Sequence, residues 1–196
     1  MITHPRSLNH IGITVPDIYK AMDWYIEVLG FSHLMGPRVL DAGNLKEKRA
    51  AIIMGPRFRK AYQAQLITAN GVGIELFQFV EPNVESYSDE NMEYWRQGYW
   101  HLCYTDPNIE QLAERIVATG GKLRTQIFDM VPGLPYKLVY AEDPFRNVLE
   151  ICSHSHAEAW SNWPHKGMNW DITMYNRDGT ESVMPNPYQL TVKDAA

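Results

Sequence analysis

Two histidines and two glutamates in this sequence have side chains that commonly bind metal ions or transfer protons. His10 and Glu75 lie in the first half of the chain, and His101 and Glu150 lie in the second half. Imidazole nitrogens and carboxylate oxygens suit a divalent ion of five- or six-fold coordination, and four such ligands leave one or two positions open. An open position is typical of a catalytic metal site. A Glu beside a bound carbonyl compound can also serve as a general base.

The two His/Glu pairs belong to a repeat in the sequence. The stretch "LNHIGITVPD" contains His10 and the stretch "YWHLCYTDPN" contains His101, and each His stands in a strand-like run. A Pro and Asp pair follows each run, and apolar residues at helical spacing come next. Gly30 stands 20 positions after His10, and Gly121 stands 20 positions after His101. The chain therefore contains two copies of one supersecondary unit.

The flanking residues predict where each of the two helices begins and ends. We expect Asp17 to be the N-cap of the first helix and Gly30 to end it. In the second half we expect Asp106 to be the N-cap and Pro107 to occupy the first helical position. The Gly pair that finishes at Gly121 is expected to end this second helix.

Each half continues with an antiparallel hairpin whose returning strand carries the Glu. Large apolar residues flank Glu75 and Glu150, and a carboxylate in such surroundings needs a partner if it is buried. Each half is thus expected to be a strand, a helix and three further strands, with a His in the first strand and a Glu in the last. The expected strand, turn and strand are 63–68, 69–71 and 72–80 in the first half, and 136–141, 143–147 and 148–154 in the second.

The two halves differ by an insertion, and an extension follows them. His10 and Glu75 are 65 positions apart whereas His101 and Glu150 are 49 apart, so the first half has 16 more residues. The aromatic content of the last 40 residues argues against disorder, and they could pack on a sheet, on a second subunit or over the site as a lid. The expected organisation is a first module over 1–80 with the insert at about 40–60, a linker over 81–97, a second module over 98–156, and an aromatic-rich C-terminal extension over 157–196.

The repeat gives the four candidate ligands a common geometry. Two copies of one unit related by a pseudo-twofold axis would aim two imidazoles and two carboxylates at one point, and a cation there would supply the counter-charge. The alternation of side chains along a strand supports common faces. It groups Glu75 with Gly73, Phe77 and Phe79, His101 with Cys103, and Glu150 with Cys152.

The stretch "LNHIGITVPDIYKAMDWYIEVLGF" resembles the opening of a vicinal oxygen chelate protein, a member of the glyoxalase/bleomycin-resistance/dioxygenase superfamily. The turn "DPFRNVLEI" resembles the Asp-Pro-x-Gly-Asn-x-x-Glu ending of that superfamily, with Arg146 where Gly is usual. The resemblance covers about residues 6–154. It implies an α+β fold of two tandem βαβββ modules that form a cupped, incomplete barrel around one divalent metal ion (Ni, Co, Mn, Zn or Fe). In the glyoxalase I and epimerase branches each module supplies a His and a Glu ligand, which by position are His10, Glu75, His101 and Glu150.

The resemblance leaves three activities open, and we favour the first. It is a divalent-metal-dependent isomerase, epimerase or glyoxalase-type lyase that acts on a small oxygenated carbonyl compound through an enediolate, with Glu75 or Glu150 as the base. The second is an extradiol-type Fe(II) dioxygenase. That branch has a His where Val-Pro-Gly stands at 131–133 here, and it uses three protein ligands rather than four. The third is a metal-free small-molecule binding protein of the drug-resistance type, which needs no His/Glu quartet.

Other residues are weaker candidates for contacts with the substrate. The hydroxyl of Tyr140 is a candidate proton donor, while Cys103 and Cys152 are either pocket-lining thiols or small core residues. Arg49 and Arg57 belong to a basic cluster in the insert, which suits a carboxylate, phosphate or thiol-conjugate group. An ordinary solvated loop explains these charges equally well.

Composition excludes several other classes of protein. A net charge of −5 disfavours a nucleic-acid partner, and the sequence has no apolar run of the length that spans a membrane. Two cysteines do not make a disulfide framework, and the N-terminus lacks the apolar core of a signal peptide. We expect a soluble cytoplasmic protein with a small-molecule substrate, and a homodimer is one way to bury the extension.

Overall fold

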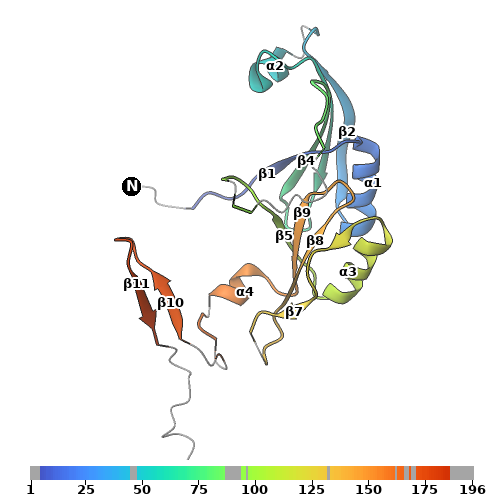
Figure 1. The fold of residues 1–196 in the computed structure, drawn as a ribbon. Helices are drawn as coiled ribbons and strands as arrows, with labels where there is room; N and C mark the ends of the chain where they lie inside the picture. Colours follow the sequence, from blue (N-terminus) through green and yellow to red (C-terminus); the bar gives the residue numbers. More distant parts are fainter. Residues whose placement is uncertain are drawn as a thin grey trace, which may run out of the picture. The chain divides into compact units, whose positions relative to one another are not determined.

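A computed structural model describes residues 5–44, 48–86, 94–95, 97–131, 133–161, 163–165, 168 and 171–185 (Figure 1). The chain divides into two compact units. The first unit comprises Met1–Glu93 with Pro144–Arg146, and the second comprises Tyr94–Asp143 with Asn147–Ala196. Each unit contains one of the two predicted modules, and each is described by itself below.

The first unit is built on a four-stranded mixed sheet. Its strands lie in the order β1-β4-β3-β2, with β1 parallel to β4 and the other neighbours antiparallel. This arrangement confirms the predicted strand, helix and three further strands. The elements are β1 (His10–Thr14), α1 (Ile18–Leu29), β2 (Ser32–Asp41), α2 (Lys48–Met54), β3 (Lys60–Ile67) and β4 (Gly73–Glu81).

Helix α1 covers one face of this sheet, and both of its predicted ends are confirmed. The Asp17 carboxylate accepts hydrogen bonds from the backbone N–H groups of Tyr19 and Lys20, which have no partner within the helix. Gly30 ends the helix with a φ of 72°, a left-handed conformation that suits Gly. The buried face of α1 packs on β2, β3 and β4, opposite alternating core residues such as Ile74 and Leu76.

The insert of the first unit contains a helix that the sequence pattern did not predict. Helix α2 lies between β2 and β3 and is only seven residues long. A small core of its own holds it in place, built on Leu40, Ala50, Phe58 and Ala61. The partly buried Phe77 and Phe79, which share a strand face with Glu75, pack against that core. The insert therefore covers part of the sheet face that carries Glu75.

The second unit repeats the first with one strand divided. Its sheet has the order β5-β9-β8-β6, with β5 parallel to β9, and the short strand β7 also pairs with β8. Two strands of two residues, β6 and β7, thus stand where the first unit has the continuous β2. The elements are β5 (Leu102–Thr105), α3 (Ile109–Ala118), β6 (Lys122–Leu123), β7 (Phe128–Asp129), β8 (Lys137–Glu142) and β9 (Val148–Cys152).

The predicted start of the second helix was wrong by two residues. Helix α3 begins at Ile109 with Asn108 as its N-cap, so Pro107 lies outside the helix. The Asp106 carboxylate accepts a hydrogen bond of 2.8 Å from the backbone N–H of Asn108, which closes a local turn before the helix begins. Such turns compete with capping at Asp residues. The helix ends at Thr119, followed by Gly120 with a φ of 94°.

The C-terminal extension forms a short helix and an isolated hairpin among the described residues. Helix α4 (His156–Trp160) begins with a capping box between Ser155 and Glu158. His165 is buried, and its Nε2 lies 2.6 Å from the carbonyl oxygen of Ala159. Strands β10 (Ile172–Tyr175) and β11 (Glu181–Met184) pair with each other. No helix among the described residues is long and apolar enough to cross a membrane.

Candidate functional site

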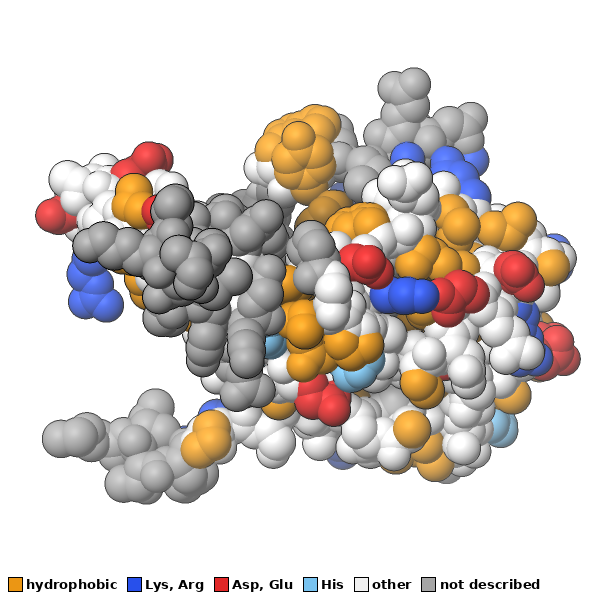
Figure 2. Space-filling model, turned by 90° about the horizontal axis from the view of Figure 1, so that it is seen from below, with side chains coloured by type: hydrophobic (Ala, Val, Ile, Leu, Met, Phe, Trp, Pro, Cys, Tyr) orange, Lys and Arg blue, Asp and Glu red, His pale blue; other side chains and the backbone are white. Residues whose placement is uncertain are grey.

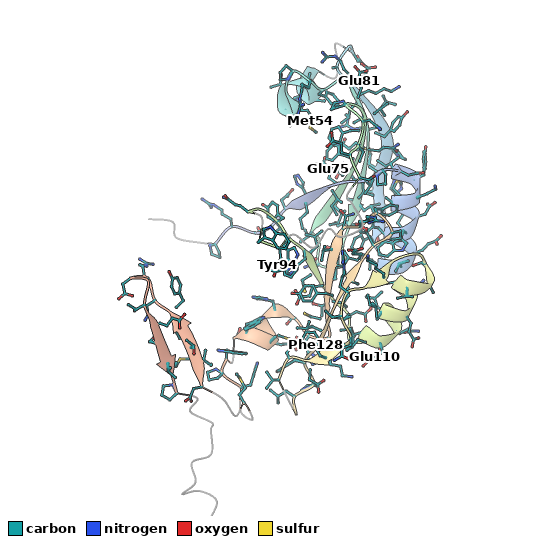
Figure 3. The ribbon with its side chains drawn as sticks, in the orientation of Figure 1. Met54, Glu75, Glu81, Tyr94, Glu110 and Phe128 are labelled. Carbon is teal, nitrogen blue, oxygen red and sulfur yellow. The ribbon has the colours of Figure 1, made fainter. Side chains whose placement is uncertain are left out.

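Glu75 lies on the face of the first sheet away from α1 (Figure 3), and His10 belongs to the neighbouring strand β1. His10 starts β1 and lies opposite Gly73 in the register, while Glu75 lies opposite Gly12. Nε2 of His10 and Oε2 of Glu75 are 3.7 Å apart. A Cβ at Gly73 would lie 2.9 Å from the Cβ of His10, closer than two such atoms approach. The absence of a side chain at Gly73 therefore lets His10 sit beside Glu75.

Two glutamine amides hold the Glu75 carboxylate in place. Oε1 of Glu75 accepts a hydrogen bond of 2.5 Å from Gln63 and another of 2.6 Å from Gln65, both on the neighbouring strand β3. Gln63 is itself oriented by Arg38, whose Nε donates a bond of 2.7 Å to the amide oxygen. The two amide donors occupy Oε1, and the other oxygen, Oε2, lies 3.7 Å from Nε2 of His10.

The His10 ring also has its second nitrogen occupied. Its Nδ1 lies 2.7 Å from Oδ1 of Asn9, which can only accept a hydrogen bond. A neutral ring that donates from Nδ1 to Asn9 has its lone pair on Nε2, the nitrogen that lies 3.7 Å from Oε2 of Glu75. This is the second contact that metal-binding histidines usually have.

The second His/Glu pair is closer together. His101 lies one residue before β5 rather than inside it, which corrects the predicted position. Its Nε2 is 2.9 Å from Oε2 of Glu150 on β9. Nδ1 of His101 is buried and has no hydrogen-bond partner among the described residues.

Two aromatic rings border this second pair. Tyr140 on β8 lies opposite Glu150 in the register. Its ring meets the His101 ring edge to face at a centroid distance of 5.4 Å, and it stacks on Trp100 at 5.2 Å. Burial raises the pKa of the Tyr140 hydroxyl above its usual value, and the Glu150 charge raises the pKa further. Tyr140 therefore stays protonated at neutral pH.

The two cysteines lie beside Glu150, and the common strand face predicted for Glu150 and Cys152 is confirmed. The Sγ atoms of Cys103 on β5 and Cys152 on β9 are 3.5 Å apart, and both thiols are free. The hydrogen bond between them, with burial, raises the pKa of Cys103, and the same bond lowers the pKa of Cys152. Neither thiol is a core residue, because Cys103 is exposed and Cys152 is only partly buried.

The basic residues proposed for the substrate are in the insert. Arg49 on α2 and Arg57 just after it are both exposed, whereas Arg59 donates to the carbonyl oxygens of Pro56 and Phe58. Lys46 lies outside the described residues. On the face drawn in Figure 2, some Lys and Arg side chains gather at the upper right, and others stand next to Asp and Glu side chains.

The donor atoms of the two pairs suit a divalent metal ion. Two ligands bound at about 2.1 Å to one ion lie about 3–3.5 Å from each other. The separations in the two pairs, 3.7 Å and 2.9 Å, lie close to that range. The 3.7 Å separation is too long for a hydrogen bond. The described residues of each unit therefore present one imidazole nitrogen and one carboxylate in an arrangement compatible with metal binding.

The two sheets define the class of the fold. Each unit has a parallel strand pair joined through a helix and an antiparallel hairpin, which is the mixed βαβββ sheet of vicinal oxygen chelate structures. Residues 7–151 match the model of the Glyoxalase/Bleomycin resistance protein/Dioxygenase superfamily, and the chain belongs to that superfamily. No curated protein sequence matches it.

Several solved structures share the fold at low sequence identity. A glyoxalase family protein from Bacillus cereus is 18% identical with a TM-score of 0.60, and the match covers 78% of this chain and 97% of that one. The fosfomycin resistance protein FosX from Listeria monocytogenes is 16% identical with a TM-score of 0.51, covering 83% and 100%. A glyoxalase I mutant from Zea mays is 17% identical with a TM-score of 0.51, covering 76% of this chain and 45% of that one.

Several contacts of the site were not foreseen from the sequence. Gln63 and Gln65 alternate along β3 opposite Glu75, and Asn9 precedes His10. The signal for the glutamines was their spacing of two positions in a strand, which puts both amides on one face. Trp100 gave no such signal, because its stacking on Tyr140 depends on the pairing of distant strands.

Proposed function

We propose that the protein is a divalent-metal-dependent enzyme of the isomerase, epimerase or glyoxalase-type lyase kind. The observation that carries this proposal is the repeat of one arrangement in both units. In each unit a His Nε2 at the start of the first strand faces a Glu carboxylate on the parallel strand beside it. A protein that only bound a small molecule would have no need of two such pairs.

In this proposal His10, Glu75, His101 and Glu150 hold one ion. When bound, the ion would polarise a carbonyl oxygen of the substrate and so acidify the hydrogen on the adjacent carbon. The substrate is a small compound with neighbouring oxygen atoms, at least one of which is a carbonyl. Four protein ligands, two of them anionic, support this chemistry over oxygenase chemistry, which uses two histidines and a single carboxylate.

We assign Glu150 as the base that removes the hydrogen, and Glu75 as a fixed ligand. The two amide hydrogen bonds to Oε1 of Glu75 restrict the movement of its carboxylate. Glu150 lies instead beside the protonated hydroxyl of Tyr140. A carboxylate that is not fixed by amide donors can accept a proton and return it at another carbon or on another face.

The protonated Tyr140 has a matching role in the proposal. Its raised pKa keeps the hydroxyl proton in place at neutral pH, so the hydroxyl acts as a hydrogen-bond donor. Next to Glu150 it would donate to a developing negative charge on the substrate oxygen. The exposed Arg49 and Arg57 are assigned no role in proton transfer, and they would contact only an anionic group of the substrate.

Hydrogen exchange with the solvent tests the reaction. The metal-loaded protein is incubated in D₂O with a panel of small α-hydroxycarbonyl and 1,2-dicarbonyl compounds, and the products are followed by NMR. We expect deuterium at the carbon next to the carbonyl, at the same rate in air and under nitrogen. Turnover that requires Fe(II) and consumes oxygen in step with product would overturn the proposal in favour of a dioxygenase.

A further inference from the structure

The second unit contains a cluster of metal-binding side chains that overlaps the His/Glu quartet at Glu150 alone. Cys103, Glu150 and Cys152 offer ligand atoms that all lie within 4.8 Å of one another. Among the residues that the structure describes, this is the one group of three or more His, Cys, Asp or Glu side chains that meets this distance. We propose that these three residues form a site for a thiophilic divalent metal ion, such as Zn²⁺ or Cd²⁺.

The separation of the two sulfur atoms fits chelation of one ion. Zn–S bonds are about 2.3 Å long, so two thiolates on a tetrahedral ion lie about 3.8 Å apart. The Sγ atoms of Cys103 and Cys152 are already 3.5 Å apart. Small side-chain rotations therefore suffice to bring both sulfurs to one ion, without any movement of the strands.

The strand register favours a metal over a disulfide at this position. In the parallel pair of β5 and β9, Cys103 lies opposite Glu150, and Cys152 lies opposite Thr105. The cysteines are thus diagonal neighbours, whose Cα atoms in a sheet are typically about 7–8 Å apart. A disulfide needs a Cα separation of about 4.4–6.8 Å, which is shorter than this typical diagonal spacing. An ion between the sulfurs spans the longer distance.

The remaining contacts complete a three-ligand site with one open position. Glu150 provides the third, oxygen ligand, and its Oε2 lies 2.9 Å from Nε2 of His101, which orients the carboxylate from the other side. Cys103 is exposed, so an ion from solution can reach the thiols and a water molecule can occupy the fourth position. Two thiolates select soft ions, whereas Mg²⁺, Ca²⁺ and Mn²⁺ prefer oxygen ligands.

The thiophilic site shares Glu150 with the proposed catalytic ion but does not depend on the proposed function. Its ligands all come from the second unit, and it contains no atom of His10 or Glu75. The Glu150 carboxylate cannot bind two ions at full strength at the same time. Binding of a thiophilic ion would therefore weaken the binding of an oxygen-preferring ion at the quartet.

Absorption spectroscopy with Co²⁺ and Cd²⁺ tests the site. Metal-free protein is kept reduced with a phosphine, two free thiols per chain are verified, and either ion is added in steps. Cys103 and Cys152 are the only cysteines of the chain, so a thiolate-to-metal charge-transfer band has a single source. We expect a band that saturates at one equivalent, that Cys103→Ser and Cys152→Ser each greatly reduce, and that Glu150→Gln shifts to at least ~10-fold higher metal concentration.

His10→Ala is the matched control, because it removes a quartet ligand and leaves the thiol site intact. This variant should keep the full Cd²⁺ band while losing Mn²⁺ binding. The two measurements therefore test the thiophilic site and the His/Glu quartet separately. Absence of a charge-transfer band in the reduced wild-type protein, or an undiminished band in both serine variants, overturns the proposal. If a serine variant does not fold, protection of both thiols from iodoacetamide by one equivalent of Cd²⁺ in the wild-type protein decides instead, and unprotected thiols refute it.

Discussion

The side-chain amide of Gln65 donates a hydrogen bond of 2.6 Å to Oε1 of Glu75 across the β3–β4 pair. The same oxygen accepts a second amide hydrogen from Gln63, so the carboxylate has one oxygen fully engaged and the other facing His10. The second unit has no amide at the corresponding place in the described residues. Its Tyr140 lies opposite Glu150 instead. The two glutamates therefore occupy matched positions in the repeat but have different chemical surroundings.

Replacement of Gln65 by Leu should lower metal affinity by about 10- to 100-fold, the usual cost of losing a group that orients a ligand. The fold should persist because Gln65 is only partly buried and its side-chain amide donates its hydrogen bond to Glu75. Isothermal titration with Mn²⁺ or Ni²⁺ measures the change. Gln78→Leu is the control, since Gln78 accepts a hydrogen bond from the backbone N–H of Ile18 and alternates to the other face of β4 from Glu75. Equal affinity in the two variants would contradict the assigned role.

The two glutamates should respond differently to replacement by Gln. In Glu150→Gln we expect turnover to fall by about 10²- to 10⁴-fold, the typical contribution of a general base, while the metal content falls less. In Glu75→Gln we expect the metal content to fall together with turnover, because a fixed anionic ligand is lost. Metal analysis and turnover are measured on the same preparations. A reversed pattern would make Glu75 the base.

The glycine beside His10 provides a test that leaves every proposed ligand in place. Ala at position 73 would bring its Cβ within 2.9 Å of the Cβ of His10, so the ring must move away from Glu75. We expect Gly73→Ala to weaken metal binding by on the order of 10-fold. Gly12→Ala is the matched control on the adjacent strand, since its Cβ would meet only Phe77 at an ordinary 3.7 Å. Unchanged metal affinity in Gly73→Ala would show that the position of His10 is unimportant.

A buried ion pair in the second unit should contribute strongly to stability. Glu142 is 3% exposed, and its carboxylate contacts the guanidinium of Arg124 and, at 3.3 Å, the Lys122 ammonium. Replacing Arg124 with Met leaves a buried carboxylate with one cation, so we expect a loss of about 3 kcal/mol in the free energy of unfolding. Urea denaturation measures it. Lys137→Met breaks the exposed pair with Glu110 and should have little effect. Equal losses in the two variants would argue against the importance of burial.

The sequence predicted the two-module repeat better than it predicted the irregular parts of the fold. The spacing of His10 and Gly30 is repeated at His101 and Gly121, and it identified both modules. The helical spacing of apolar residues and the glycines that end the helices can be recognised in a single sequence. Asp17 was correctly placed, since its carboxylate accepts hydrogen bonds from two backbone N–H groups at the start of α1.

The remaining features depend on interactions that leave no pattern along the chain. Strands β6 and β7 have two residues each, too few to show alternation, and α2 is held by contacts with β2 and β3 rather than by its own periodicity. Helix α3 starts later than predicted because the carboxylate of Asp106 accepts a hydrogen bond within a turn instead of capping the helix. Arg146 takes a φ of 73° where the superfamily has Gly, held in a turn between Asp143 and Asn147. The start of a helix and the conformation of a turn depend on local competition between hydrogen bonds.

An electron-density map with metal anomalous signal tests the central claim most directly. Crystals of the protein grown with Ni²⁺ or Mn²⁺ and without thiophilic ions should show one strong anomalous peak per chain. We predict that Nε2 of His10, a carboxylate oxygen of Glu75, Nε2 of His101 and a carboxylate oxygen of Glu150 all lie about 2.0–2.2 Å from that peak. A map without a peak at these four side chains, or with a peak that contacts the ligands of one unit only, would contradict the proposal of a shared catalytic metal ion.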